Sequence, residues 1–362
     1  VNAGALTGEQ NICVGSTTSF SSDGNTGGTW SSVSTSVATV NGSGVVTGVA
    51  AGTTTIRYVV AGSGGCSNDT ATRTVTVTAA PVAGTLSGTQ AICSNGTTTL
   101  SSTSAGGSWS SSDDAVATIN ASTGVVTPVA SGTATMTYTV TGTGGCDNAT
   151  ATRSVTVTDA VHAGSLSGTQ GICVSGTTTF TTSGDEGGSW SSVNTAIATV
   201  DASGEVTGLA AGTTTIRYVV AGSGGCSNDT ATRTVTVTAA PVAGTLSGTQ
   251  NICSNGTTTL SSTSAGGSWS SSDEAVATIN ASTGVVTPVG AGTATMTYTV
   301  TGTGGCDNAT ATRTVTVTTA VNAGALTGEQ NICVGSTTSF SSDGNTGGTW
   351  SSVSTSVATV NG

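Results

Sequence analysis

The sequence predicts an all-β protein, built as a tandem array of seven-stranded sandwiches of about 80 residues each. Cysteines and tryptophans recur at a spacing of about 80 residues along the whole chain. Threonine and valine alternate in many short runs, as expected for strands with one buried face. Turns rich in Gly, Ser and Asn separate these runs at intervals of about 8–12 residues, which is typical of a β-sandwich.

The composition limits the kinds of protein that the chain can be. It has 362 residues, of which 54 are Gly and only 6% are charged, and its formal net charge is −11. A hydrophobic share of 35% argues against a disordered linker. Because the chain is acidic and has no lysine, nucleic acid is not an expected partner. No apolar run approaches the roughly 18 residues of a membrane span, so we expect no membrane insertion.

The repeats predict the domain organisation. We expect four complete units and part of a fifth, with the bounds 1–80, 81–160, 161–240, 241–320 and 321–362. Alternate units are more similar than neighbouring ones, which gives a second period of 160 residues. Residues 321–362 reproduce residues 1–42 without a change. The chain starts and stops within its own pattern, and we expect a truncated last unit and a fragment of a longer protein.

The elements of the unit can be placed in order in the first repeat. The expected strands are 5–13, 16–22, 28–33, 36–40, 44–49, 53–61 and 71–78. Gly15 turns the chain after the first strand, and the turn NGSG precedes the fifth. The third strand carries a tryptophan, which a sandwich of this kind buries. We therefore expect a core position for each tryptophan: Trp30, Trp109, Trp190, Trp269 and Trp350.

The run WSSSDDAVATINASTGVVTPVASGTATMTYTV (109–140) resembles the bacterial immunoglobulin-like domain of the group 2 type. The family pattern is a Trp-Ser-Ser strand, a Val-Ala-Thr-Val strand, Gly-Val-Val-Thr and then Gly-Thr-Ala-Thr-Ile, and every complete repeat has these pieces in order. The resemblance implies an immunoglobulin-like sandwich in an extracellular stalk or fibre. Two cysteines per repeat and the glycine-rich turns depart from the family pattern. These features resemble secreted repeat proteins of Bacteroidota, including giant surface adhesins and grappling-hook-type filaments.

The cysteines predict disulfides and therefore an oxidising compartment. We expect pairing within each repeat, because small secreted domains usually hold such a bond: Cys13–Cys66, Cys93–Cys146, Cys173–Cys226 and Cys253–Cys306. One geometric objection is that the first and last turns of a sandwich lie at opposite poles, roughly 23 Å apart for a seven-residue strand. The alternative pairing joins neighbouring repeats: Cys13–Cys146, Cys93–Cys226 and Cys173–Cys306.

Other side chains give weaker signals. Adjacent acids in turns could bind Ca²⁺, although we expect solvated turn residues and no cofactor: Asp113–Asp114, Asp185–Glu186 and Asp273–Glu274. A Ser nucleophile needs a base, and the chain has a single histidine, His162, so we expect no enzyme. The triplet Asp-Thr-Ala resembles a Bacteroidota O-glycosylation motif and marks Thr70 and Thr230. Arg57 and Arg73 are expected to pair with surface acids or to mark an interface between chains.

Two functions fit these observations. The first is a structural segment of a long extracellular filament or stalk at a bacterial surface, which bundles with other copies of itself. Attachment to a cell or prey surface would then be made by parts outside this segment. The alternative is that the repeats are themselves adhesive modules that bind glycans or surfaces, although the sequence has no patch rich in aromatic or charged residues.

Overall fold

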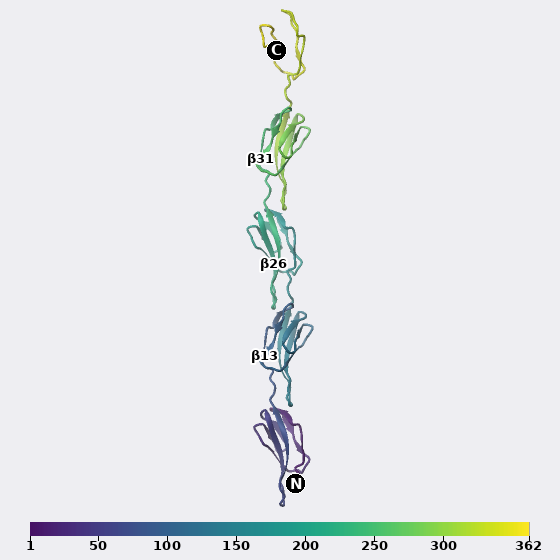
Figure 1. Ribbon diagram of the computed structural model, residues 1–362, viewed down its shortest axis with the longest axis vertical. Coiled ribbons are helices and arrows are strands. Elements are labelled where there is room, and N and C mark those ends of the chain that lie inside the picture. The colour runs from purple at the N-terminus through teal and green to yellow at the C-terminus, as the bar shows by residue number, and fades with distance from the viewer. Residues whose placement is uncertain (362) are drawn as a thin grey trace. The chain divides into compact units, whose positions relative to one another are not determined.

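The computed structural model describes residues 1–361, which form strands, turns and loops (Figure 1). Among these residues there is no helix with the length and apolarity that crossing a membrane requires. The chain divides into two compact units. One comprises Val1–Gly164, Ser183–Ser189 and Val219–Ala231; the other comprises Ser165–Thr182, Trp190–Tyr218 and Thr232–Gly362.

Four repeats have the same series of nine short strands. Those of the first repeat are β1 (Leu6–Thr7), β2 (Asn11–Cys13), β3 (Thr17–Ser19), β4 (Ser21–Ser22), β5 (Thr29–Ser32), β6 (Ala38–Val40), β7 (Val45–Gly48), β8 (Gly52–Val60) and β9 (Asp69–Thr78). Those of the second are β10 (Leu86–Ser87), β11 (Ala91–Cys93), β12 (Thr98–Thr99), β13 (Ser101–Ser102), β14 (Ser108–Ser111), β15 (Ala117–Ile119), β16 (Val125–Pro128), β17 (Gly132–Val140) and β18 (Ala149–Thr158).

The later repeats follow the same order. The strands of the third are β19 (Leu166–Ser167), β20 (Gly171–Cys173), β21 (Thr177–Thr179), β22 (Thr181–Thr182), β23 (Ser189–Ser192), β24 (Ala198–Val200), β25 (Glu205–Gly208), β26 (Gly212–Val220) and β27 (Asp229–Thr238). Those of the fourth are β28 (Leu246–Ser247), β29 (Asn251–Cys253), β30 (Thr258–Thr259), β31 (Ser261–Ser262), β32 (Ser268–Ser271), β33 (Ala277–Ile279), β34 (Val285–Pro288), β35 (Gly292–Val300) and β36 (Ala309–Thr318). After these, β37 (Leu326–Thr327) pairs with β38 (Ser341–Ser342).

Each sandwich packs a four-stranded sheet against a three-stranded one. In the first repeat the orders are β2-β9-β8-β5 and β3-β7-β6, and β1 pairs with β4 in a small third sheet. β2 runs parallel to β9, with Ile12 opposite Val77, and the other pairs are antiparallel. The second and fourth repeats have the same topology, and in the third β20 likewise runs parallel to β27. The immunoglobulin-like sandwich and the repeat length of about 80 residues are confirmed.

The two main sheets have seven strands together, as predicted, and β1 and β4 are two further short strands because the predicted strands 5–13 and 16–22 are each interrupted. Gly8 has φ +130°, and a Cβ there would lie 2.4 Å from the carbonyl oxygen of Ser19. The chain bends at this glycine and passes from the β1–β4 pair into the four-stranded sheet, so 5–13 becomes two strands. The predicted strand 16–22 is broken at Phe20, whose side chain is buried in the core. Strand propensity alone does not show such a switch between sheets.

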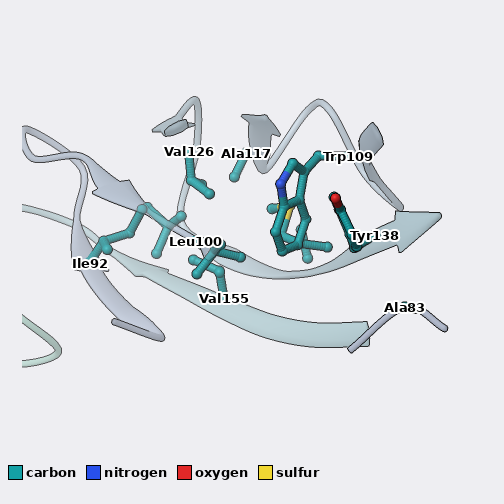
Figure 2. Close-up of a cluster of buried hydrophobic side chains, with 11 residues drawn as sticks. Ala83, Ile92, Leu100, Trp109, Ala117, Val126, Tyr138 and Val155 are labelled. Carbon is teal, nitrogen blue, oxygen red and sulfur yellow. The ribbon is translucent and has the colours of Figure 1, made fainter. Parts of the chain in front are cut away.

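The core of each sandwich lies between its two main sheets. Figure 2 shows it in the second repeat, where Trp109 packs with Tyr138, their ring centroids 4.9 Å apart. The Tyr138 hydroxyl donates a hydrogen bond to the Ser104 carbonyl at 2.9 Å and accepts one from the Gly107 amide at 2.8 Å. These bonds satisfy the polar end of a buried ring.

The cores of neighbouring repeats differ in a compensating way. Odd repeats bury Phe20 or Phe180 together with an isoleucine, Ile56 or Ile216. In the corresponding places, even repeats bury a leucine with a methionine: Leu100 with Met136, and Leu260 with Met296. A smaller side chain at one position is thus paired with a longer, unbranched one at the other, which conserves core volume. Part of the 160-residue period is therefore a difference in core packing.

Candidate functional site

A glycine-rich turn connects the last two strands of each repeat and is termed here the hairpin tip: residues 62–68, 142–148, 222–228 and 302–308. In the first repeat, Gly64 and Gly65 have φ +63° and +86°, a left-handed conformation that glycine adopts readily. The side-chain oxygen of Asn68 accepts a hydrogen bond from the Gly62 amide at 2.9 Å. The tip is therefore shaped by its own residues.

The opposite pole of each sandwich is termed the receiving end. In the first repeat it consists of β2, Asn11–Cys13, and of Thr78, the last residue of β9, which lies opposite Cys13 in the parallel pair. The equivalent residues in later repeats are 91–93 with Thr158, 171–173 with Thr238 and 251–253 with Thr318.

The hairpin tip of one repeat packs against the receiving end of the repeat before it. A Cβ on Gly144 would lie 2.1 Å from Thr78 Oγ1, and one on Gly145 would lie 2.8 Å from the Asn11 carbonyl oxygen. The same approach recurs at Gly224 on Thr158 and at Gly304 on Thr238, at 2.0 and 2.2 Å. A side chain at these glycines would clash with the preceding repeat, so the contact depends on them.

At each of these three contacts, a disulfide joins the hairpin tip to the receiving end. The bonds are Cys13–Cys146, Cys93–Cys226 and Cys173–Cys306, with Cα–Cα distances of 4.8, 4.6 and 4.7 Å. The expected pairing within repeats, Cys13–Cys66, Cys93–Cys146, Cys173–Cys226 and Cys253–Cys306, is wrong, and the alternative between neighbours is found.

The reason for this connectivity is the length of the last strand. Cys13 lies beside the end of β9, whereas Cys66 lies before its start. The ten residues of β9 separate these poles by roughly 30 Å, and a disulfide needs Cα atoms within about 7 Å. Three cysteines have no disulfide partner among residues 1–361, and all three are exposed: Cys66, Cys253 and Cys333.

The linker between the second and third repeats forms hydrogen bonds with both of these repeats. The Ala160 amide donates to Ser94 Oγ at 2.9 Å, in the second repeat. The His162 amide donates to Asp185 Oδ2 and the Ala163 amide to Asp229 Oδ2, both at 2.8 Å, in the third. A cleft of about 490 Å³ beside this linker is lined by residues that include His162 and Asp229. Among residues 1–361, no three or more His, Cys, Asp or Glu side chains group as a metal site would require.

The hydrogen bonds to Asp229 predict a dependence on pH. The Ala163 amide, and next the Thr230 amide, lower the pKa of the Asp229 carboxyl. Because the pKa is lowered, the ionised Asp229 carboxylate stabilises the folded state fully when the pH is above the ordinary pKa of an aspartate. This stabilisation is lost as the pH falls through the lowered pKa. We expect Asp229 to titrate below the ordinary range in carboxyl NMR, with faster amide exchange at Ala163 below that point once intrinsic exchange is subtracted.

A matched control for this prediction exists in the chain, because alanine occupies the equivalent positions, Ala149 and Ala309, of the even repeats. Asp229→Ala should remove the pH dependence at Ala163. Equal protection of Ala163 in the variant and the native protein at neutral pH would contradict the assignment.

The remaining predicted residues lie as follows. Trp109 and Trp269 are buried, Trp30 and Trp190 are half-buried against their cores, and Trp350 is half-buried in the last segment. Asp113 and Asp273 each accept a hydrogen bond from a backbone amide two residues on, as turn residues do. Calcium binding by the acidic pairs and glycosylation of Thr70 and Thr230, which are exposed, stay predictions.

Arg73 contacts backbone carbonyls and not the expected surface acid, whereas a role of Arg57 and Arg73 at an interface between chains stays a prediction. The equivalent arginines of the four complete repeats each donate hydrogen bonds to the carbonyl of the leucine in the first strand and to the carbonyl of the glycine just after that strand: Arg73, Arg153, Arg233 and Arg313. The alternative cysteine pairing already joined these two turns, but sequence reasoning missed the close approach of the hairpin-tip glycines to the receiving end. The available signal was the pair of glycines directly before the last-turn cysteine, which occurs in all four complete repeats.

The chain is thus an array of immunoglobulin-like sandwiches, joined by linkers and by disulfides between neighbours. The sequence profile of the bacterial Ig-like domain (group 2) matches residues 7–75 and 151–229, less than half of the chain. This match supports a bacterial Ig-like repeat protein, and no curated protein sequence matches the chain.

Several solved structures are similar in fold. Invasin, a bacterial integrin-binding protein, has 15% identity over 86% of this chain and 78% of its own, with a TM-score of 0.31. A C-terminal fragment of intimin has 22% identity over 42% and 62%, with a TM-score of 0.28. The S-layer protein SbsC has 16% identity over 89% and 56%, with a TM-score of 0.22. At these TM-scores the likenesses carry no argument about function.

Proposed function

We propose that the chain is a structural segment of a long extracellular filament or stalk, in which disulfides between successive repeats carry tension. The observation behind this proposal is the connectivity. Each bond joins the receiving end of one repeat to the hairpin tip of the next, at a sequence separation of 133 residues. Such bonds form in oxidising compartments, which supports a location outside the cell.

The disulfides shorten the covalent route along the chain. A route from Cys13 crosses to Cys146, follows the backbone to Cys173 and crosses to Cys306. Its 27 backbone residues extend to about 95 Å at roughly 3.5 Å per residue. The backbone route from Cys13 to Cys306 would extend to about 1,000 Å. Residues 14–145 and 174–305 lie inside the loops, so pulling on the ends does not draw them out while the bonds are intact.

Other features support a fibre of several chains. The four-stranded sheet of the first repeat ends in β5 and the three-stranded sheet in β6, so both strands have an unpaired edge. Lysine, which often protects such edges from pairing with other chains, is absent from the sequence. Similar surfaces recur along the array, so that weak lateral contacts add up. Bundling with other copies and use in attachment or prey contact are parts of the proposal.

The proposal predicts a large effect of reduction on extension under force. With handles at the two chain ends, the reduced protein should lengthen in successive steps as its four complete repeats unfold. Each repeat of about 80 residues releases up to about 280 Å of chain. The oxidised protein should show no step of this size. Single-molecule force spectroscopy, with and without reductant on the same protein, measures both.

The control for this experiment is a Cys66→Ser, Cys253→Ser, Cys333→Ser protein, which keeps only the three inter-repeat disulfides. It should behave as the oxidised native chain does. Steps near the full length of a repeat in this oxidised variant would show that tension passes through the folded sandwiches, and the proposed role would be wrong.

A further inference from the structure

In even repeats, the edge strand that carries the tryptophan is covered by a neighbouring turn. The Trp109 amide, in β14, donates a hydrogen bond to the carbonyl of Ala121, in the turn after β15, at 3.0 Å. Ser111 Oγ donates another to the Ala117 carbonyl in β15 at 2.7 Å. The fourth repeat has the same two bonds: Trp269 to Ala281 at 2.9 Å and Ser271 to Ala277 at 2.7 Å. The edge of the four-stranded sheet is thus bonded to the three-stranded sheet.

In odd repeats, the same edge is uncovered. The turn after β6, residues 41–44, is one residue shorter than its counterpart 120–124, and among residues 1–361 no carbonyl of this turn accepts a hydrogen bond from the Trp30 amide. The Ser32 hydroxyl lies 3.5 Å from Oγ1 of Thr54, a buried threonine where even repeats have alanine. The equivalent residues of the third repeat are arranged alike: Trp190, Ser192 and Thr214, the last two 3.5 Å apart.

The open edge also exposes apolar surface. Trp30 and Trp190 are half-buried, whereas the tryptophans of the even repeats are 6% and 7% exposed. Directly after the strand, Val33 and Val193 are each 57% exposed, and even repeats have serine at that position. An exposed apolar residue beside an uncovered edge strand favours pairing with another chain.

The unpaired backbone groups of this edge belong to Trp30 and Ser32. The Val33 amide donates to the Thr55 carbonyl of β8 at 2.9 Å, and hydrogen-bonded residues alternate along an antiparallel strand. Ser31 therefore also bonds to β8, whereas Trp30 and Ser32 direct their N–H and C=O groups away from it. The strand can accept one more antiparallel strand, bonded at these two residues.

We infer that the open edge of an odd repeat pairs antiparallel with the same edge of a second copy of this chain. Ser31 then lies opposite its own counterpart, and Trp30 lies opposite the counterpart of Ser32. In this register each pair of Trp30 and Ser32 exchanges both of its backbone hydrogen bonds. In the third repeat, β23 allows the same pairing around Ser191. The two four-stranded sheets then form one continuous sheet.

The edge is complementary to itself. On the outer face, Val33 comes to lie opposite the counterpart of Thr29, so the exposed valine is covered in both copies. Residues 29–33 have no charge, and the arginine beside them, Arg57, is in register with Ser31 on β8. Two such arginines would be three strand spacings apart, roughly 14 Å, which exceeds the Debye length of about 8 Å at physiological ionic strength. Charge repulsion therefore does not oppose the pairing.

A second copy is the occupant that the repeat pattern favours. Each edge strand has four residues, and so short a pair is marginally stable alone. A second copy presents the same edge again after 160 residues, so that weak pairings act together. The inference rests on the proposed function, because bundling of copies belongs to it, and it names the strands that bundle.

Disulfide trapping tests the pairing on the full chain. Ser31→Cys and Ser191→Cys are made together in the Cys66→Ser, Cys253→Ser, Cys333→Ser protein. The serines that lie opposite each other form a pair without hydrogen bonds, with Cα atoms about 4.5 Å apart, which suits a disulfide. Mild oxidation should give chain dimers joined through the introduced thiols, with the three native disulfides intact in peptide maps.

The matched control places thiols on the covered edges, as Ser110→Cys and Ser270→Cys in the same background. All four serines are exposed, so random collisions trap the two proteins equally. We expect at least about tenfold more dimer from the open edges, which corresponds to about 1.4 kcal/mol of pairing energy. Equal dimer yields from the two variants would overturn the inference.

Amide exchange of the native chain supplies a second measurement. The Trp109 and Trp269 amides should be protected at every protein concentration, whereas the Trp30 and Trp190 amides should become protected only as the concentration rises. Trapped dimers without this protection would show contact in another register and would also contradict the pairing. The force experiment above uses single molecules, so a failure of the pairing and a failure of the tension-bearing role are distinguishable.

Discussion

Replacing Cys93 and Cys226 together by serine should lower the free energy of unfolding of the second and third repeats by about 4–5 kcal/mol. The disulfide joins residues 133 apart, and closing a loop of that length removes much conformational freedom from the unfolded chain. The variant should also lose coupling between these repeats, because a covalent tie between two folding units makes the unfolding of one depend on the other. Urea unfolding followed by the fluorescence of Trp109 and Trp190, in the absence of reductant, measures both effects.

The matched control is a Cys66→Ser, Cys253→Ser protein. Both thiols are free and exposed, so we expect a change of less than about 0.5 kcal/mol. A similar loss of stability in the two double variants would show that the serine substitutions themselves are harmful and that the bond between repeats adds little. A change in the urea dependence alone, without a change in midpoint, would also contradict the expected effect.

Most of the fold could be predicted because each sandwich is built from local signals. Alternating Val and Thr predict β9, and glycine predicts its turns. The hairpin between β8 and β9, with Trp30 and Tyr58 packed on the same sheet, follows from these runs. The breaks at Gly8 and Phe20 could not be predicted, since they depend on where the chain leaves one sheet for another. That choice is made by the packing of the whole sandwich rather than by propensity.

At the candidate site, the disulfide connectivity is the feature that was predicted wrongly from the sequence. The pairing within repeats would form four disulfides and the pairing between neighbours forms three, and the residue types around the cysteines do not distinguish the two schemes. The pairing within repeats was predicted because small secreted domains usually hold such a bond. The strand length gave the opposite answer, because a ten-residue last strand places Cys13 and Cys66 at different poles. The sequence alone did not show how closely the glycines of the hairpin tip approach the receiving end of the preceding repeat, because that distance depends on how the two sandwiches pack.

Replacement of Arg73 by alanine should destabilise the first repeat by about 3 kcal/mol, far more than its position on an exposed-looking Thr-rich strand suggests. The guanidinium donates from Nη1 to the Leu6 carbonyl at 2.8 Å, and from Nη2 and Nε to the Gly8 carbonyl at 2.6 and 3.1 Å. It also lies over the Phe20 ring, 5.6 Å from its centroid. Hydrogen bonds from a charged donor contribute about 1.5–3 kcal/mol each, and their loss here leaves two partly buried carbonyls without these donors.

The control for Arg73→Ala lies on the adjacent strand, where Arg57 is exposed and pairs in register with Thr72. Arg57→Ala should change stability by less than about 0.5 kcal/mol, and Arg73→Lys should recover only part of the loss because an ammonium cannot span both carbonyls as a planar fork does. Urea unfolding followed at Trp30 measures the free energy of unfolding of the three variants. Faster amide exchange around β1 would show that the loss of stability begins at this strand. If Arg73→Ala and Arg57→Ala proved equal, the arginine would be a surface charge. If they differ as expected, Arg153, Arg233 and Arg313, which bind the equivalent two carbonyls through Nη1 and Nη2, hold the first strand of each complete repeat and, with it, the strand that carries the receiving cysteine. Arg233 does so without the Nε hydrogen bond, because this atom is buried and has no partner among residues 1–361.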